Sequence, residues 1–129
     1  MYLRLLETII RESDKNFMKE ACCKMIIKYF GKENEQELKM INYGNDEDKF
    51  DFSSFMDPIV QIMARSFEYG SKLTSLSIMT MVNMCNFQDF IKHILIDKNG
   101  SYIINELLES KDEEILLNNL RLIMSLISV

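Results

Sequence analysis

Residues 73–85 read LTSLSIMTMVNMC, residues 115–127 read ILLNNLRLIMSLI, and the two stretches align without a gap at a distance of 42 positions. Their apolar residues recur at the spacing of one face of an α-helix. The matched pairs are Leu73 with Ile115, Ile78 with Leu120, Met81 with Ile123, and Met84 with Leu126. A helical unit that recurs after about 40 residues is typical of stacked-helix solenoids.

A third copy of this pattern runs from Phe17 to Tyr29. The interval from Phe17 to Leu73 is 56 residues, which exceeds the other interval by 14. We therefore expect an insertion between the first two copies. The matches of the third copy are Phe17, Ala21, Cys22 and Met25, aligned with Ile115, Asn119, Leu120 and Ile123.

Composition favours a single all-α domain. The chain has 129 residues, of which 47% are hydrophobic, a length and an apolar content that suit one domain with a continuous core. One proline, four glycines and no tryptophan argue against a β-rich or disordered chain. No apolar run approaches the roughly 18 residues of a membrane span, so we expect none.

Charge and cysteine content limit the cellular compartments and the classes of partner that the sequence is compatible with. The net charge of −5 disfavours nucleic acid as the main partner, because phosphate binding needs clustered Lys and Arg. Three cysteines give no even disulfide framework and no CxxC pair, which indicates a reducing, intracellular environment. We expect the cytoplasm, with a cytoskeletal or ciliary assembly as an alternative.

Start and stop signals divide the chain into helices. Ser13 or Asp14 is expected to cap the second helix, and Asp57-Pro58 reads as a helix start with the proline in the first turn. All four glycines fall at expected helix ends or in loops. The expected helices cover about 2–12, 15–30, 58–69, 71–85, 87–97, 101–109 and 113–128, with a short additional helix at 35–42.

Residues 99–120 (NGSYIINELLESKDEEILLNNL) resemble an armadillo repeat. They share a glycine turn, a helix ending in Glu-Leu-Leu, a Ser-x-Asp-Glu-Glu turn, and a long third helix with an early Asn. The resemblance implies an all-α, armadillo-like right-handed superhelix of about two and a half repeats. Its units would be about 2–30, 35–85 and 87–128, with an acidic insertion within 31–52. A two-helix HEAT-type solenoid and a compact bundle are the alternatives.

In armadillo proteins the third helices line a concave groove that binds other proteins. The Asn positions that grip peptides in family members map to Ile27, Asn83 and Ser125, and only Asn83 matches. The family's Trp positions map to Cys23, Met79 and Arg121, so peptide capture of the nuclear-import type is not expected. The resemblance instead implies a polar strip on this face, for which a solvated surface is the alternative. The strip comprises Met79, Asn83, Asn118, Arg121 and Ser125.

An acidic docking loop is a second candidate site. Residues 31–52 hold seven acids against three lysines, which suits a basic partner surface. Aromatic residues beside acids can anchor such a contact. The alternatives are a solvated loop for the acids and packing at the next helix start for the aromatics. The candidate residues are Asp46, Glu47, Asp48, Phe50 and Phe52.

Catalysis and metal binding are not expected. His93 is the only histidine, and no Cys, Ser or carboxylate stands near it at a motif spacing. Cys22 and Cys23 are about 100° apart around a helix, so they cannot easily share one metal. Cys22 and Cys85 read as small core residues. We expect no metal site, no catalytic residue and no cofactor.

The sequence thus predicts a non-enzymatic protein–protein interaction module, an adaptor or a structural component of a larger complex. Binding would use the concave third-helix face or an exposed solenoid end. Apolar residues crowd 2–6 (YLRLL) and 122–129 (LIMSLISV), which favours a homo-oligomer or a larger assembly. The alternatives are a regulatory module for a chaperone or small GTPase, and a non-catalytic subunit of an enzyme complex.

Overall fold

The computed structural model of the chain describes residues 2–31 and 50–128. These two ranges contain eight α-helices and no strand, which confirms the all-α prediction. The expected helix at 35–42 and most of the expected acidic insertion lie outside them. The helices are α1 (Tyr2–Glu12), α2 (Asn16–Tyr29), α4 (Phe52–Ala64), α5 (Ser66–Tyr69), α6 (Ser71–Phe87), α7 (Asp89–Asp97), α8 (Gly100–Leu107) and α9 (Glu113–Ile127).

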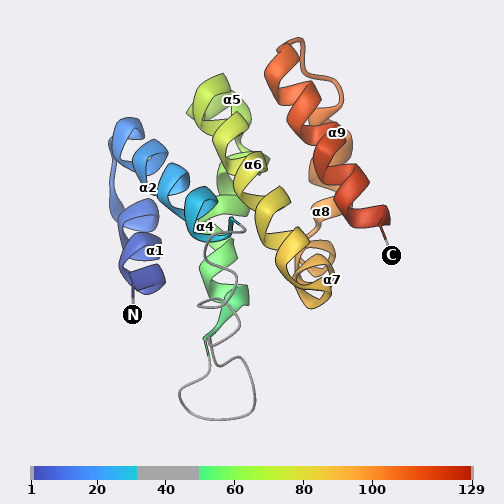
Figure 1. The fold of residues 1–129 in the computed structure, drawn as a ribbon. Helices are drawn as coiled ribbons and strands as arrows, with labels where there is room; N and C mark the ends of the chain where they lie inside the picture. The colour runs from blue at the N-terminus through green and yellow to red at the C-terminus, as the bar shows by residue number, and fades with distance from the viewer. Residues whose placement is uncertain (1, 32–49, 129) are drawn as a thin grey trace.

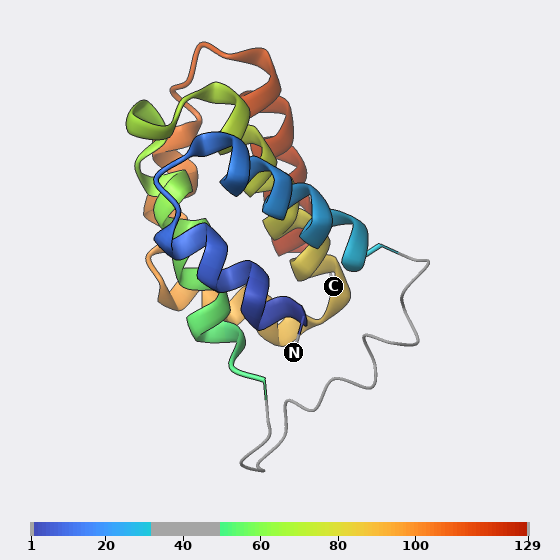
Figure 2. The same cartoon turned by 90° about the vertical axis from the view of Figure 1, so that its left-hand side faces the viewer.

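The long helices form two rows. Helices α2, α6 and α9 follow one another across the molecule, and α6 packs against both of its neighbours (Figure 1). In the second row α4 packs against α1 and α8 (Figure 2). Helix α7 contacts α4, α6 and α8. The first helices of the chain and α9 therefore lie at opposite edges of the molecule (Figure 1).

The core lies between the two rows. Ile59 of α4, Ile78 and Met81 of α6, and Leu95 of α7 are fully buried. Burial of an aliphatic side chain of this size contributes about 1.5–3 kcal/mol relative to exposure. Helix α6 supplies more fully buried residues than any other described helix, because it has a neighbour on each side.

The starts of α6 and α9 agree with the sequence signals. The Asp112 side chain accepts hydrogen bonds from the backbone N–H groups of Glu114 and Ile115, at 2.9 and 3.1 Å. These bonds satisfy two of the free donors at the N-terminus of α9. Helix α6 begins after Gly70, whose φ of 85° favours glycine and lets the chain turn sharply out of α5.

The expected helix start at Asp57-Pro58 is wrong. Helix α4 begins six residues earlier, at Phe52, where the Asp51 side chain accepts a hydrogen bond from the Ser54 N–H at 3.1 Å. Pro58 lies inside the helix, so it offers no N–H to the carbonyl of Ser54. Helix α4 also ends at Ala64 rather than near Tyr69, and the short α5 follows it.

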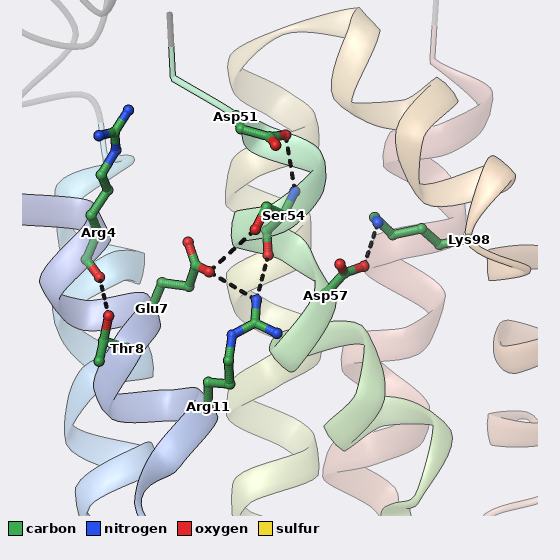
Figure 3. Close-up of polar contacts among 8 residues, drawn as sticks. All are labelled: Arg4, Glu7, Thr8, Arg11, Asp51, Ser54, Asp57 and Lys98. Atoms are coloured by element: carbon green, nitrogen blue, oxygen red, sulfur yellow. Dashed lines mark hydrogen bonds and ion pairs between the residues drawn. The ribbon is translucent and has the colours of Figure 1, made fainter. Parts of the chain in front are cut away.

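A side chain from α1 replaces the bond that Pro58 removes. The guanidinium of Arg11 donates to the Ser54 carbonyl at 3.1 Å and pairs with Glu7 at 2.8 Å (Figure 3). The Ser54 hydroxyl in turn donates to Glu7 at 3.4 Å. Helix α4 can therefore continue through the proline, because α1 satisfies the orphaned carbonyl.

The beginning of α2 differs from the expectation in capping and register. Lys15, not Ser13 or Asp14, is its N-cap residue, and no side chain caps the helix. Phe17, which the repeat alignment placed inside, is exposed. A shift of 55 instead of 56 residues brings the buried positions of α2 onto those of α6. It aligns Lys19, Cys23, Ile26 and Phe30 with Thr74, Ile78, Met81 and Cys85.

Lys19 is a charged residue inside this pattern. Its ammonium donates to the carbonyl of Ile10 in the last turn of α1, and it lies 5.6 Å from the centre of the Tyr69 ring. Burial lowers the pKa of Lys19. The side chain thus joins α1, α2 and the end of α5, and its hydrogen bond to the Ile10 carbonyl partly compensates its burial.

Candidate binding surfaces

The predicted polar strip spans the row of α2, α6 and α9, but two of its amides join neighbouring helices. The Asn83 amide donates to the carbonyl of Ile27 at 2.9 Å, which ties α6 to α2. The Asn118 amide donates to the Ser75 hydroxyl at 2.7 Å, which ties α9 to α6. Both amides therefore contribute to helix packing, a role that the sequence prediction did not foresee.

The other members of the strip differ in accessibility. Ser125 is buried, Met79 is half-buried and Arg121 is exposed. The Arg121 guanidinium donates to the Asn118 side-chain oxygen at 3.0 Å, so it is held against α9. Arg121 and part of Met79 are the strip residues that a partner can reach without disturbing the packing.

Two apolar residues that the sequence reasoning missed flank Arg121. Leu117 and Met124 precede and follow it by four and three positions, which makes them neighbours on one helix face. Both are exposed, Met124 at 65%. The spacing was visible in the sequence, but these residues were assigned to no surface because the mapping followed the family's polar positions.

The acidic docking site receives no support from the residues that the structure describes. Asp46, Glu47 and Asp48 lie outside the described ranges. Phe50 and Phe52 are buried, and their ring centres are 4.7 Å apart. The two rings belong to an aromatic cluster at the start of α4, so they do not stand on the surface as docking anchors. The other rings in contact with them are Phe30, Phe55, Phe87 and Phe90.

Each helix of the α2–α6–α9 row carries a face with the spacing i, i+4, i+7, i+11, which we call its stacking face. In α6 this face lies opposite Asn83, the residue that binds α2. It faces the core between the rows, next to Ser75, the residue that binds α9. Every member of the face is buried in α2 and in α6. The stacking face of α2 is Lys19, Cys23, Ile26 and Phe30, and that of α6 is Thr74, Ile78, Met81 and Cys85.

The stacking face of α9 is open. It consists of Leu116, Leu120, Ile123 and Ile127, 42 positions after the residues of the α6 face. It lies opposite Asn118, the residue that binds α6. Leu120 is 50% exposed and Ile127 73% exposed, while Leu116 and Ile123 are half-buried. Leu120 and Ile127 are thus the exposed members of this apolar ladder, whereas Ile123 also packs against the core.

A groove of about 760 Å³ runs between α4, α5 and α8. Phe67, which is 89% exposed, lines the groove from α5, and Tyr102 lines it from α8. An ion pair between Asp57 and Lys98 also borders the groove (Figure 3). The groove is amphipathic, but its charged pair is already neutralised within the protein.

The thiols are placed for packing. All three cysteines are buried and free, as expected for Cys22 and Cys85. Burial raises the pKa of Cys23 to about 11 and that of Cys85 to about 12. Neither thiol forms an appreciable amount of thiolate near neutral pH, which makes both poor nucleophiles.

Among residues 2–31 and 50–128, no three His, Cys, Asp or Glu side chains form a group that could hold a metal ion. The described helices also include none that is long and apolar enough to cross a membrane.

Comparison with known proteins does not assign the chain to a family. No protein-family model matches it, and no curated protein or solved structure matches it significantly.

Proposed function

We propose that the chain is a non-enzymatic protein-binding module that docks an α-helix of its partner against α9. The observation that carries the proposal is the open stacking face of α9. The corresponding positions are buried in α2 and in α6, the two helices of the row that have a following neighbour. A helix laid on Leu120 and Ile127 would therefore continue the row, in which α6 packs beside α2 and α9 packs beside α6.

The mechanism is apolar complementarity on a rigid scaffold. Side chains at i, i+4, i+7 and i+11 are the type of ladder that meets an amphipathic partner helix. Burial of each exposed Leu or Ile would contribute up to about 1.5–3 kcal/mol, against the cost of association. Leu117, Arg121 and Met124 adjoin this ladder and would extend the contact onto the outer side of α9.

Charge favours a basic partner. Residues 99–128, which include α8 and α9, hold five acids against two basic residues. Glu113 and Glu114 lie in the first turn of α9 and are exposed. Opposite charges at the rim of an interface speed association and select partners more than they add affinity.

We also propose that the architecture is armadillo-like, with about two and a half repeats. The repeated stacking faces and the two rows of helices support this proposal. The same pattern suits a structural or adaptor role, since stacked-helix proteins offer long surfaces to partners.

The proposal is tested by affinity capture from the cells that express the protein, with mass spectrometry of the bound proteins. The test variant carries Leu120→Glu and Ile127→Glu, and the control carries Phe67→Glu, an exposed position beyond α9. We expect the test variant to lose partners that the wild type and the control retain, with an unchanged melting temperature. Identical sets of captured proteins from all three would overturn the proposal.

A further inference from the structure

Two helices that run in the same direction form the walls of the groove between α4, α5 and α8. At one end the ion pair of Asp57 with Lys98 joins the middle of α4 to the turn before α8 (Figure 3). At the other end the Ser71 hydroxyl donates a hydrogen bond to Asp112, which places the turn after α5 beside the turn after α8. Between these two contacts α4 packs against α8. The groove is therefore held at both ends by polar contacts within the protein.

The lining of the groove combines buried apolar residues with exposed aromatic rings. The rings are those of Phe67 on α5 and Tyr102 on α8. Apolar walls with a few aromatic and polar groups are typical of places where proteins bind ligands. The buried apolar residues that line the groove are Val60, Met63, Ile103 and Leu107.

One negative charge in the groove is not neutralised. Glu106 lines the groove one helical turn after Tyr102, on the same face of α8, and it is exposed. The ion pair at the far end cancels its own charges, and Arg65 next to the groove pairs with Glu68 at 3.8 Å. Among the described residues, none forms an ion pair or a side-chain hydrogen bond with the Glu106 carboxylate. The groove therefore favours a cation close to an aromatic ring.

Two side-chain amides give the groove further hydrogen-bonding groups. Gln61 of α4 and Asn99 at the start of α8 line it, and both are exposed. Within the described part of the chain, neither amide forms a hydrogen bond. Such amides can donate to and accept from the backbone of an extended peptide. The wall formed by residues 99–107 is about 12 Å long, which accommodates about four residues of extended chain.

We propose that this groove binds a short peptide segment of a partner protein through an arginine side chain. The guanidinium would stack on an aromatic ring and pair with the Glu106 carboxylate, while apolar neighbours of the arginine would cover the buried lining. Arginine fits better than lysine, because its planar guanidinium both stacks on rings and binds a carboxylate with two hydrogen bonds. The site is separate from the proposed function, since its lining residues come from α4, α5, α8 and the turn before α8.

Fluorescence anisotropy of fluorescein-labelled octapeptides tests the inference. One peptide set holds a fixed arginine between degenerate uncharged positions, and a second set holds citrulline, an uncharged isostere of arginine, in its place. We expect the arginine set to bind about tenfold more tightly, because citrulline forms neither the ion pair nor the cation–π contact. Equal affinities of the two sets would overturn the inference, and so would a lack of binding by the arginine set up to about 1 mM.

Glu106→Gln and Glu109→Gln form a matched pair of variants. Each removes one exposed acid, but Glu106 lines the groove and Glu109, three residues later, does not. Glu106→Gln should weaken binding of the arginine set by about three- to fivefold and leave the citrulline set unchanged. Glu109→Gln should keep the wild-type affinity for both sets. Equal losses in the two variants would indicate a general effect of net charge and would contradict the assigned contact.

A further pair of variants separates this site from the α9 face. Phe67→Ala should weaken binding of both peptide sets, because it removes an aromatic ring from the groove. The double variant Leu120→Glu, Ile127→Glu should bind the arginine set at least as tightly as the wild type. Loss of binding in the α9 variant, with full binding by Phe67→Ala, would place the peptides on α9 and overturn this inference. Failure of the affinity capture through α9 would leave the groove unaffected.

Discussion

Helices α6 and α9 carry the same ladder of positions in different surroundings. Ile78 in α6 is fully buried, whereas Leu120, its counterpart 42 residues later, is 50% exposed. The difference arises from the neighbours: α6 lies between two helices of its row, and α9 contacts only α6 within it. The exposure of Leu120 therefore reflects the lack of a further helix beside α9 among the described residues, and for this reason we propose this face as the place for a partner.

The largest expected effect separates these two positions directly. Ile78→Ala should lower the free energy of unfolding by about 2–5 kcal/mol, because it leaves a cavity in a packed interior. Leu120→Ala should change it by less than about 0.5 kcal/mol in dilute protein, because the side chain already contacts water. Urea denaturation of both variants measures the difference. Equal losses would show that α9 is covered in the monomer.

A second pair of variants compares polar residues at equivalent positions of α6 and α9. Asn83→Ala should cost about 1 kcal/mol, because it removes the bond to the Ile27 carbonyl between α6 and α2. Ser125→Ala, 42 positions later, should change stability less, because the nearest helix is held through Asn118 instead. The same urea titrations apply, and a larger loss for Ser125→Ala would contradict the assignment of these contacts.

A smaller effect is expected in the second row of helices, where Arg11 of α1 stabilises α4. Arg11→Ala should cost roughly 0.5–1.5 kcal/mol, because the Ser54 carbonyl loses its partner. In a Pro58→Ala background the restored N–H can serve that carbonyl, so the cost of Arg11→Ala should shrink. A double-mutant cycle measures this coupling. A cost that is unchanged by the proline substitution would refute the role given to Arg11.

The smallest effect concerns the two helix starts and pH. Hydrogen bonds from the Ile115 backbone and the Ser71 side chain lower the pKa of Asp112 in the folded protein. A depressed carboxyl pKa contributes stability above the unfolded value, about 3.9, and this contribution is lost as pH falls through the folded value. Helix α6 has no capping side chain and no such dependence at its start.

Melting temperatures measured from neutral to acidic pH, for the wild type and for Asp112→Asn, test this effect. Asparagine can still cap the helix but cannot titrate. The variant should therefore lose less stability than the wild type in the acidic range. Parallel pH profiles for the two proteins would contradict the contribution of Asp112.

The sequence predicted the helices best where the signals were local. Asp112 caps α9 and Gly70 precedes α6 because capping and positive φ depend on a few adjacent residues. The Asp57-Pro58 signal failed for two reasons: Asp51 supplies a competing local cap six residues upstream, and Arg11 from another helix satisfies the carbonyl that Pro58 leaves free. No local pattern contains the second contact.

The candidate site could be predicted only in part, for a similar reason. The repeat placed Asn83, Asn118 and Arg121 on α6 and α9, which lie side by side in the row α2–α6–α9. It could not indicate that the two Asn side chains bind neighbouring helices. Helical spacing shows toward which side a residue points, but it does not identify the group that the residue contacts there. The open α9 face was visible as apolar spacing, but its exposure became clear only from the arrangement of the helices.

Oxidation of the native methionines by hydrogen peroxide, followed by mass spectrometry, tests the central claim most directly and needs no mutation. Met124 on α9 is 65% exposed, whereas Met81 on the stacking face of α6 is fully buried by its neighbours. Because oxidation follows access of the reagent to the sulfur, Met124 should react early and Met81 only when the protein unfolds. Oxidation of Met81 as fast as Met124 in the folded protein would show that α6 is not enclosed by its neighbours, and the account of the packed row would be wrong.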